Sequence, residues 1–191
     1  LKQSESRFRN LVEKATFPIC ILKGEDMVLE LSNEALLSAW HVDKEAMGKP
    51  FLQILPEMKD QPFPAYMLDV YKNGVTHYGN EEPAYFITKN GEKITTYFNF
   101  VYQPYHEEDG TISGVMIMAS DVTEQVTAIK KMEESENKFR VISELMPEKI
   151  WTSDEKGNKI YFNKTMLDYL GATAEELTGG GWKKRIHPED W

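Results

Sequence analysis

The chain has 191 residues, 41% of them hydrophobic and 28% charged, and its formal net charge is −9. This composition predicts folded domains rather than disorder, and the excess of negative charge argues against nucleic acid as a partner. The single cysteine, Cys20, excludes an internal disulfide and fits a reducing compartment. Because no stretch approaches about 18 consecutive apolar residues, we expect a cytoplasmic protein that makes no membrane contact through this part of its chain.

Short elements are predicted in the first quarter of the chain. Residues 4–15 carry apolar side chains at helical spacing and predict an amphipathic helix. Two apolar runs, 17–22 and 27–31, flank a polar turn and predict a β-hairpin. Residues 33–40 again have helical spacing, and Asp43 is placed to cap one further turn. The domain therefore opens with a helix and two strands, followed by short helices.

The next part of the chain predicts a longer helix and then β structure. Residues 64–73 have a helical pattern that ends at Gly74, a residue typical of helix ends. Three β-type segments follow at 75–88, 93–104 and 111–120, joined by turns that contain glycine. The predicted order is therefore two strands, several short helices and three strands.

A charged helix is predicted after the last strand. In Asp121-Val122-Thr123-Glu124, an acceptor side chain precedes a glutamate by three residues, which is the pattern of a capping box. The helix should begin there and continue to about Leu145. Its apolar residues form a stripe that is too irregular for a regular coiled coil.

The chain also contains an internal repeat. Ser4-Glu5-Ser6-Arg7-Phe8-Arg9 recurs as Ser135-Glu136-Asn137-Lys138-Phe139-Arg140, an offset of 131 residues. Three further matches follow in the same order: residues 18–21 with 147–152, 31–34 with 161–164, and 42–48 with 172–179. Matches that keep their order and nearly the same offset indicate two copies of one domain, the second cut short after Trp191.

This order of elements, with Asp121-Val122-Thr123 at the end of the last strand, resembles the PAS sensory domain family. The resemblance covers residues 5–123 and again 136–191, where Ile186-His187-Pro188-Glu189-Asp190 is similar to a His-Pro-acidic segment of many PAS domains. It implies an α+β fold, with a PAS-like five-stranded antiparallel sheet and short flanking helices around a cavity, then a long connector helix. The implied division is a leading helix (1–16), a complete PAS-like domain (17–123), a helical connector (124–145) and the first part of a second PAS-like domain (146–191).

The resemblance implies a signal-sensing and relay module, similar to the tandem PAS regions that form the input of bacterial two-component sensor histidine kinases. No catalytic residue is expected in this fragment, since the sequence lacks a phosphoacceptor-histidine motif, a glycine-rich nucleotide loop and a cyclase signature. The parent protein would be a phosphorelay kinase whose output domain lies elsewhere in the same chain. Apolar residues left over on the two long helices favour a homodimer. Two alternatives stay open: a structural dimerisation spacer with no ligand, and the input region of another output such as a cyclase.

The inward face of the last three predicted strands is rich in apolar side chains. Alternation along the strands, together with the family resemblance, directs these residues toward the cavity. The ligand-pocket candidates are Ala84, Phe86, Phe98, Phe100, Tyr102, Val115, Ile117 and Ala119. A small apolar or aromatic ligand would fit such a face, and so would an ordinary core in which the side chains fill the space.

No cofactor is assigned, and two are disfavoured. Light-sensing flavin relatives hold a reactive cysteine in an Asn-Cys-Arg-Phe-Leu-Gln motif, where this chain reads Gly48-Lys49-Pro50-Phe51-Leu52-Gln53. A flavin with a cysteinyl adduct is therefore disfavoured, and Cys20 is expected to be a buried structural thiol. Haem-binding relatives often use a histidine on the helix predicted at 64–73, whereas His41 and His77 lie outside it. The histidines and the cysteine also lack the spacing of a zinc site, so no metal is expected.

Asp121 and Thr123 are the residues expected to relay a signal. Their side chains can tie the end of the last strand to the start of the connector helix. A change in the sheet would then become a displacement of the helix. The simpler alternative is a static helix cap.

Overall fold

The computed structural model describes residues 2–88, 90–185 and 187. The chain divides into two compact units, residues 1–127 and 128–191. The elements of the first unit occur in the predicted order: α1 (Lys2–Lys14), β1 (Ile19–Lys23), β2 (Val28–Ser32), α2 (Glu34–Ala39), η1 (Lys44–Ala46), α3 (Phe51–Ile54), η2 (Pro56–Met58), α4 (Phe63–Asn73), β3 (His77–Ile87), β4 (Lys93–His106) and β5 (Ile112–Asp121). Helix α5 (Thr123–Leu145) follows and ends at the residue predicted for it.

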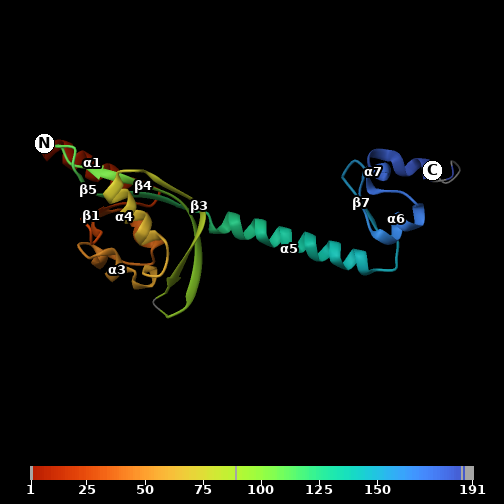
Figure 1. Cartoon of the computed structure of the whole chain (residues 1–191), viewed down its shortest axis with the longest axis horizontal. Coiled ribbons are helices and arrows are strands. Elements are labelled where there is room, and N and C mark those ends of the chain that lie inside the picture. Colours follow the sequence, from red (N-terminus) through yellow and green to blue (C-terminus); the bar gives the residue numbers. More distant parts are fainter. Residues whose placement is uncertain (1, 89, 186, 188–191) are drawn as a thin grey trace. The chain divides into compact units, whose positions relative to one another are not determined.

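The five strands form one antiparallel sheet in the order β2-β1-β5-β4-β3 (Figure 1). Strand β5 lies in the centre, where Ile117 is opposite Cys20 of β1 and Tyr102 of β4. Gly114 permits this close pairing, because a Cβ atom at its position would lie 2.1 Å from the carbonyl oxygen of Leu22. The predicted fold class, an α+β domain on a five-stranded antiparallel sheet, is confirmed.

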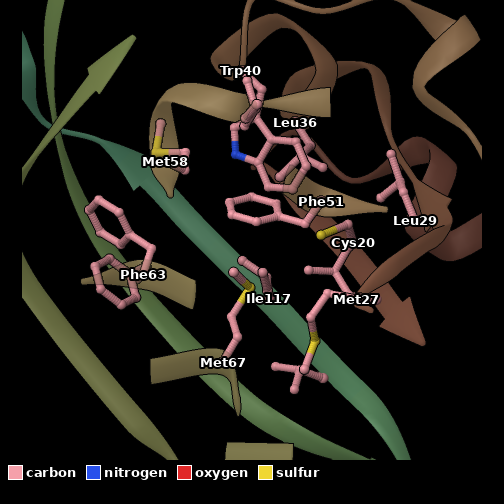
Figure 2. Packing of buried hydrophobic residues seen from close by; sticks show 14 of the residues in the cluster. Cys20, Met27, Leu29, Leu36, Trp40, Phe51, Met58, Phe63, Met67 and Ile117 are labelled. Atoms are coloured by element: carbon pink, nitrogen blue, oxygen red, sulfur yellow. The ribbon is translucent and has the colours of Figure 1, made fainter. Parts of the chain in front are cut away.

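The main core fills the space between one face of the sheet and the short helices (Figure 2). Trp40, at the end of α2, packs edge-on against Phe51 of α3 with ring centroids 5.4 Å apart. Met67 of α4 is fully buried, as is Leu22 of β1. Each such side chain contributes roughly 1.5–3 kcal/mol when it leaves water. Burial of these side chains therefore holds the helices over the sheet.

Helix α1 covers part of the opposite face of the sheet. Its Val12 is buried with Ile19, Ile21 and Leu31, which alternate along β1 and β2 with residues of the main core. Leu11, on the same helix, remains 72% exposed. The helix therefore buries Val12 against the sheet and leaves Leu11 uncovered.

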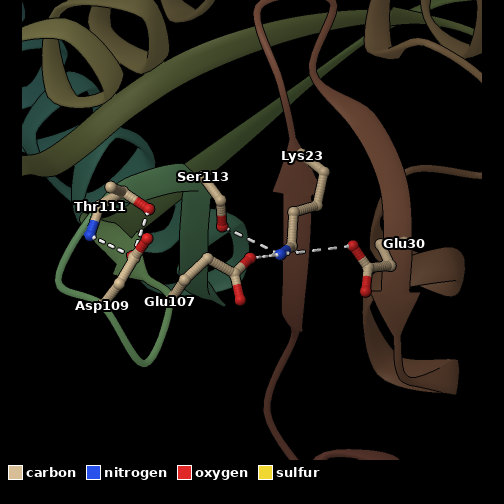
Figure 3. Close-up of polar contacts among 6 residues, drawn as sticks. All are labelled: Lys23, Glu30, Glu107, Asp109, Thr111 and Ser113. Atoms are coloured by element: carbon tan, nitrogen blue, oxygen red, sulfur yellow. Dashed lines mark hydrogen bonds and ion pairs between the residues drawn. The ribbon is translucent and has the colours of Figure 1, made fainter.

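A charged cluster joins the end of β1 to the hairpin between β4 and β5 (Figure 3). The ammonium group of Lys23 forms an ion pair with Glu107, donates a hydrogen bond to Ser113 Oγ at 2.9 Å, and lies 3.8 Å from a carboxylate oxygen of Glu30. It also lies 4.7 Å from the ring centroid of Tyr105. Hydrogen bonds from Lys23 and then Ser113 lower the pKa of Glu107 below its ordinary value. The cluster fixes the hairpin beside the first strand.

The second unit begins as the first one does. Strands β6 (Trp151–Ser153) and β7 (Lys159–Phe162) pair antiparallel and are followed by α6 (Lys164–Leu170), α7 (Ala174–Leu177) and η3 (Thr178–Arg185). Two strands followed by short helices is also the order in which the first domain begins after α1. Of the His-Pro-acidic segment at 186–190, only His187 lies among the described residues. Across the described part of the chain, we find no helix that is both long and apolar enough to cross a membrane.

Candidate functional site

A small cavity lies between the inner face of the sheet and the short helices. Its volume is about 40 Å³. Seven of the eight residues predicted to line it do so: Ala84, Phe86, Phe98, Phe100, Tyr102, Ile117 and Ala119. The eighth, Val115, is fully buried in the same core but does not line the cavity.

The helices supply the other side of the cavity, which the sequence did not predict. Trp40, Phe51 and Met58 line the cavity from the helical side, and Ile117 lines it from β5 (Figure 2). Leu36, Ala39, Leu55 and Phe63 complete the helical lining, and Pro18 lies just before β1. The lining is therefore made up of apolar and aromatic residues.

Aromatic rings occupy most of this space. Phe100 lies 4.5 Å from Tyr102 and 5.7 Å from Phe63 between ring centroids, and Phe86 lies 6.1 Å from Phe98. An apolar cavity of this size stays dry, and it is far smaller than the roughly 300–1,000 Å³ of pockets that hold drug-sized ligands. A flat cofactor would have to displace several of these rings.

The groups with acid–base chemistry near the cavity are buried. Burial raises the pKa of the Cys20 thiol well above its ordinary range, and burial likewise raises the pKa of the Tyr102 hydroxyl. A thiol held in its neutral form is a poor nucleophile and a poor metal ligand. Cys20 therefore acts as a small apolar group in the core.

The two histidines near the first domain's core pack as aromatic rings. His77 stacks on Tyr66 with ring centroids 4.0 Å apart, and His41 meets Phe86 edge-on at 5.7 Å. Within the described ranges, no three or more His, Cys, Asp or Glu side chains gather as they would to hold a metal ion.

A joint of three hydrogen bonds connects the sheet to α5. The Thr123 hydroxyl accepts from the backbone N–H of Tyr97 on β4 at 2.8 Å, and the Tyr97 carbonyl accepts from Val122 N at 2.8 Å. The Asp121 carboxylate accepts from Thr123 N at 2.8 Å. Val122 and Val126 are buried beside these polar contacts. The two predicted relay residues thus lie together, at the point where strands β4 and β5 meet the helix.

The contact made by Asp121 differs from the one predicted. A capping box would have Asp121 accept from the N–H three residues along the chain, at Glu124. Instead Asp121 is still the last residue of β5, and its carboxylate reaches the N–H two residues along. The turn is therefore an Asx turn, although the helix begins where the capping box placed it.

Comparison with known proteins gives this fold a family context. A family model described as PAS fold matches residues 12–127, and one described as PAS domain matches residues 147–190. The uncharacterized protein y4lL of Sinorhizobium fredii is 34% identical over 83 residues, which make up 44% of this chain and 10% of that protein. The chain thus spans about a tenth of the length of this curated relative.

Two solved structures align with parts of this chain. An RNA-binding light-oxygen-voltage receptor aligns with a TM-score of 0.53 and 16% identity, covering 70% of this chain and 36% of that one. A sensory box sensor histidine kinase from Vibrio cholerae aligns with a TM-score of 0.42 and 26% identity, covering 64% of this chain and 94% of that one. The first of these alignments supports the fold and nothing further.

Proposed function

Because the chain belongs to the PAS family, whose fold covers residues 12–127, we propose that it is the signal-input and relay region of a bacterial two-component sensor histidine kinase. The PAS sensory domain detects and relays, and the transferase activity belongs to an output domain elsewhere in the same cytoplasmic chain. A second PAS match at 147–190, after one continuous helix, supports a tandem arrangement. We divide the region into a leading helix (1–16), a sensing domain (17–123), a connector (124–145) and the second domain (146–191).

The observation that carries this proposal is the bond between β4 and the first residue of α5. Strand β4 supplies three cavity-lining rings, beginning at Phe98. Tyr97 immediately precedes Phe98, and its N–H is the group that the Thr123 hydroxyl accepts. A displacement of the rings moves the β4 backbone, and that motion pulls on the start of the helix. Two packings of the joint then correspond to two signalling states.

The input of the proposed sensor is a small apolar ligand or a partner protein. A cavity of about 40 Å³ accepts a ligand of more than a few atoms only when side chains move. Movement of the rings on β4 is also the motion that the joint would transmit. Native mass spectrometry with an absorption spectrum of the same sample tests this input. A retained mass that Phe98→Ala abolishes supports a ligand in the first domain, whereas a bare protein mass favours a partner protein or a core filled by the domain's own side chains.

Replacement of Asp121 by Ala in the full-length protein tests the relay itself. The variant removes the acceptor for Thr123 N and leaves the Thr123–Tyr97 bond in place. Asp109→Ala is the matched control, because Asp109 accepts from Thr111 N at 2.9 Å in an Asx turn of the β4–β5 hairpin. We expect Asp121→Ala to change output activity more than stability. If Asp121→Ala lost output activity and stability to the same extent as Asp109→Ala does, the joint would be a static helix cap and not a relay.

A structural dimerisation spacer is the second candidate function. The small volume of the cavity favours it, because the domain's own side chains already provide a filled core. In that case neither a ligand nor the Asp121→Ala variant alters the output activity, which depends only on the spacing between the neighbouring domains. Insertion of residues in α5 would then change output while Asp121→Ala would not.

We also propose that the region forms a homodimer. Leu11 of α1 is 72% exposed and Met132 of α5 is 73% exposed, and both belong to apolar stripes on their helices. Apolar surface of this kind commonly marks a protein contact. Light scattering of the purified chain tests the proposal: a mass of two chains supports it, and a single-chain mass that persists at high concentration contradicts it.

A further inference from the structure

An asparagine of the first domain joins three elements. The Asn33 carbonyl oxygen accepts from Leu36 N at 3.0 Å and from Ile19 N at 3.2 Å, which caps α2 and holds the start of β1. Its amide nitrogen donates to the carbonyl oxygens of Ala15 at 2.9 Å and Phe17 at 2.7 Å. Asn33 is almost fully buried. The end of α1 is therefore fastened to the first strand and to the next helix by one side chain.

The second copy repeats this arrangement at the end of α5. The Asn163 carbonyl oxygen accepts from Ile150 N and Met166 N, both at 3.0 Å. Its amide nitrogen donates to the carbonyl oxygens of Ser143 at 2.8 Å and Glu148 at 2.9 Å. Ser143 belongs to α5, so the helix that leaves the first joint occupies, in the second copy, the place that α1 has in the first.

The second copy adds a carboxylate contact that the first copy cannot make. One oxygen of Glu144 accepts from the Tyr161 hydroxyl at 2.8 Å, and the other accepts from Lys164 N at 2.8 Å. Tyr161 belongs to β7, and Lys164 is the first residue of α6. The position matching Tyr161 in the first copy is Leu31, which has no hydroxyl group.

Glu144 therefore holds the last turn of α5 at two points. A single hydrogen bond leaves a helix free to rotate about the contact, whereas bonds from one carboxylate to a strand and to a helix fix rotation and axial position together. Phe139, one turn earlier, supports the same arrangement through an edge-on contact with the Tyr161 ring at 5.5 Å. The arrangement is thus a lock between α5 and the first elements of the second copy.

We propose that the Glu144–Tyr161 lock is the receiving end of the relay: it makes the strand β7 and the helix α6 follow the position of α5. This inference rests on the proposed function of the Thr123 joint as the sending end. In the absence of the lock, Asn163 and the hydrogen bond from the Thr165 hydroxyl to the Met146 carbonyl oxygen at 3.0 Å still hold the second copy against the end of the helix, but the bonds from Glu144 to β7 and to the first residue of α6 are lost. Glu144 and Tyr161 are therefore positioning residues for the signal rather than sensing residues.

Amide hydrogen exchange of the 191-residue chain tests the lock. Thr123→Val perturbs the sending joint, and the readout is exchange in residues 159–170, which contain β7 and α6. With the lock intact, we expect Thr123→Val to accelerate amide exchange in residues 159–170 by about fivefold. A change of this size corresponds to the loss of the net stability that one hydrogen bond contributes. With Glu144→Ala or Tyr161→Phe added, the further response to Thr123→Val should vanish. Tyr161→Phe keeps the ring, so it separates loss of the lock from loss of folding.

Glu134→Ala is the matched control, because Glu134 is also an exposed glutamate on α5. The response to Thr123→Val should persist in that background. An equal response with and without Glu144 would overturn the lock and leave the relay standing. No response at residues 159–170 in the intact chain would overturn the relay, and the lock with it.

Discussion

Phe98→Ala measures how far the domain's own side chains fill its cavity. Phe98 is 6% exposed, lines the cavity, and lies 6.1 Å from Phe86 between ring centroids. Truncation of a buried phenylalanine costs about 3–5 kcal/mol, which is a large part of the roughly 5–15 kcal/mol that stabilises a typical domain. We therefore expect a large fall in the midpoint of urea unfolding. The outer-face control Tyr85→Ala, at a residue 54% exposed, should change stability by no more than about 0.5 kcal/mol.

The same unfolding experiment, repeated with benzene, shows whether the wild-type cavity is already filled. An enlarged apolar cavity binds such a molecule, and a ligand at a hundred times its dissociation constant restores about 2.7 kcal/mol. Benzene should therefore raise the unfolding midpoint of Phe98→Ala and leave the wild-type midpoint unchanged. Equal stabilisation of the two proteins would show that the wild-type cavity is open, and a loss below about 1 kcal/mol would refute the packing described for Phe98.

Three further outcomes follow from the packing and the charges. Gly114→Ala should lower the free energy of unfolding by about 1–3 kcal/mol, because its Cβ would meet the Leu22 carbonyl oxygen; an unchanged urea midpoint would contradict the strand register. The lowered pKa of Glu107 makes its contribution to stability present above the ordinary value of 4.5 and lost as pH falls through the folded-state value. Lys23→Met should therefore flatten the acid side of the stability profile, and an unaltered profile would mean that the ion pair contributes nothing. The Cys20 thiol, buried with a raised pKa, should react with iodoacetamide only in denaturant, and fast labelling of the native chain would contradict its burial.

Local alternation predicted the strands and which of their residues share a face, whereas the antiparallel sheet and the cavity on that face were implied by the resemblance to the PAS family. Phe98, Phe100 and Tyr102 face inward as their spacing of two requires. Gly74 ends α4 with a positive φ of 69°, the geometry for which glycine is favoured. Such features are set by a few neighbouring residues and can be recognised without a structure.

The rest of the site depends on contacts between distant residues. Trp40, Phe51 and Met58 reach the cavity through the packing of short helices, which no periodicity encodes. Val115 follows the alternation of β5 correctly and is buried, yet the cavity does not extend to its position. Alternation predicts the face of a strand but not how far along that face an open space extends.

Asp121 and Thr123 lie between the last strand and α5, as the sequence predicted, but the contact of Asp121 differs from the predicted one. Asp121 remains in extended backbone, so its carboxylate reaches Thr123 N before it can reach Glu124 N. The role of the asparagines was missed, although the repeat aligned Asn33 with Asn163. A polar residue that recurs at matching positions between a strand and a helix is the signal that could have identified both caps.

For the sensor histidine kinase that we propose, the most direct test of the relay is the autophosphorylation rate of the full-length protein with Thr123→Val or Thr127→Val. Thr127 is the matched control, because its hydroxyl only donates within α5, to the Thr123 carbonyl oxygen at 2.7 Å. At a temperature where both variants are folded, Thr123→Val should change the rate by about fivefold or more, the scale of typical allosteric coupling, and Thr127→Val should leave it near wild type. Equal rates in the two variants would contradict the account, because the bond to Tyr97 would then carry no signal.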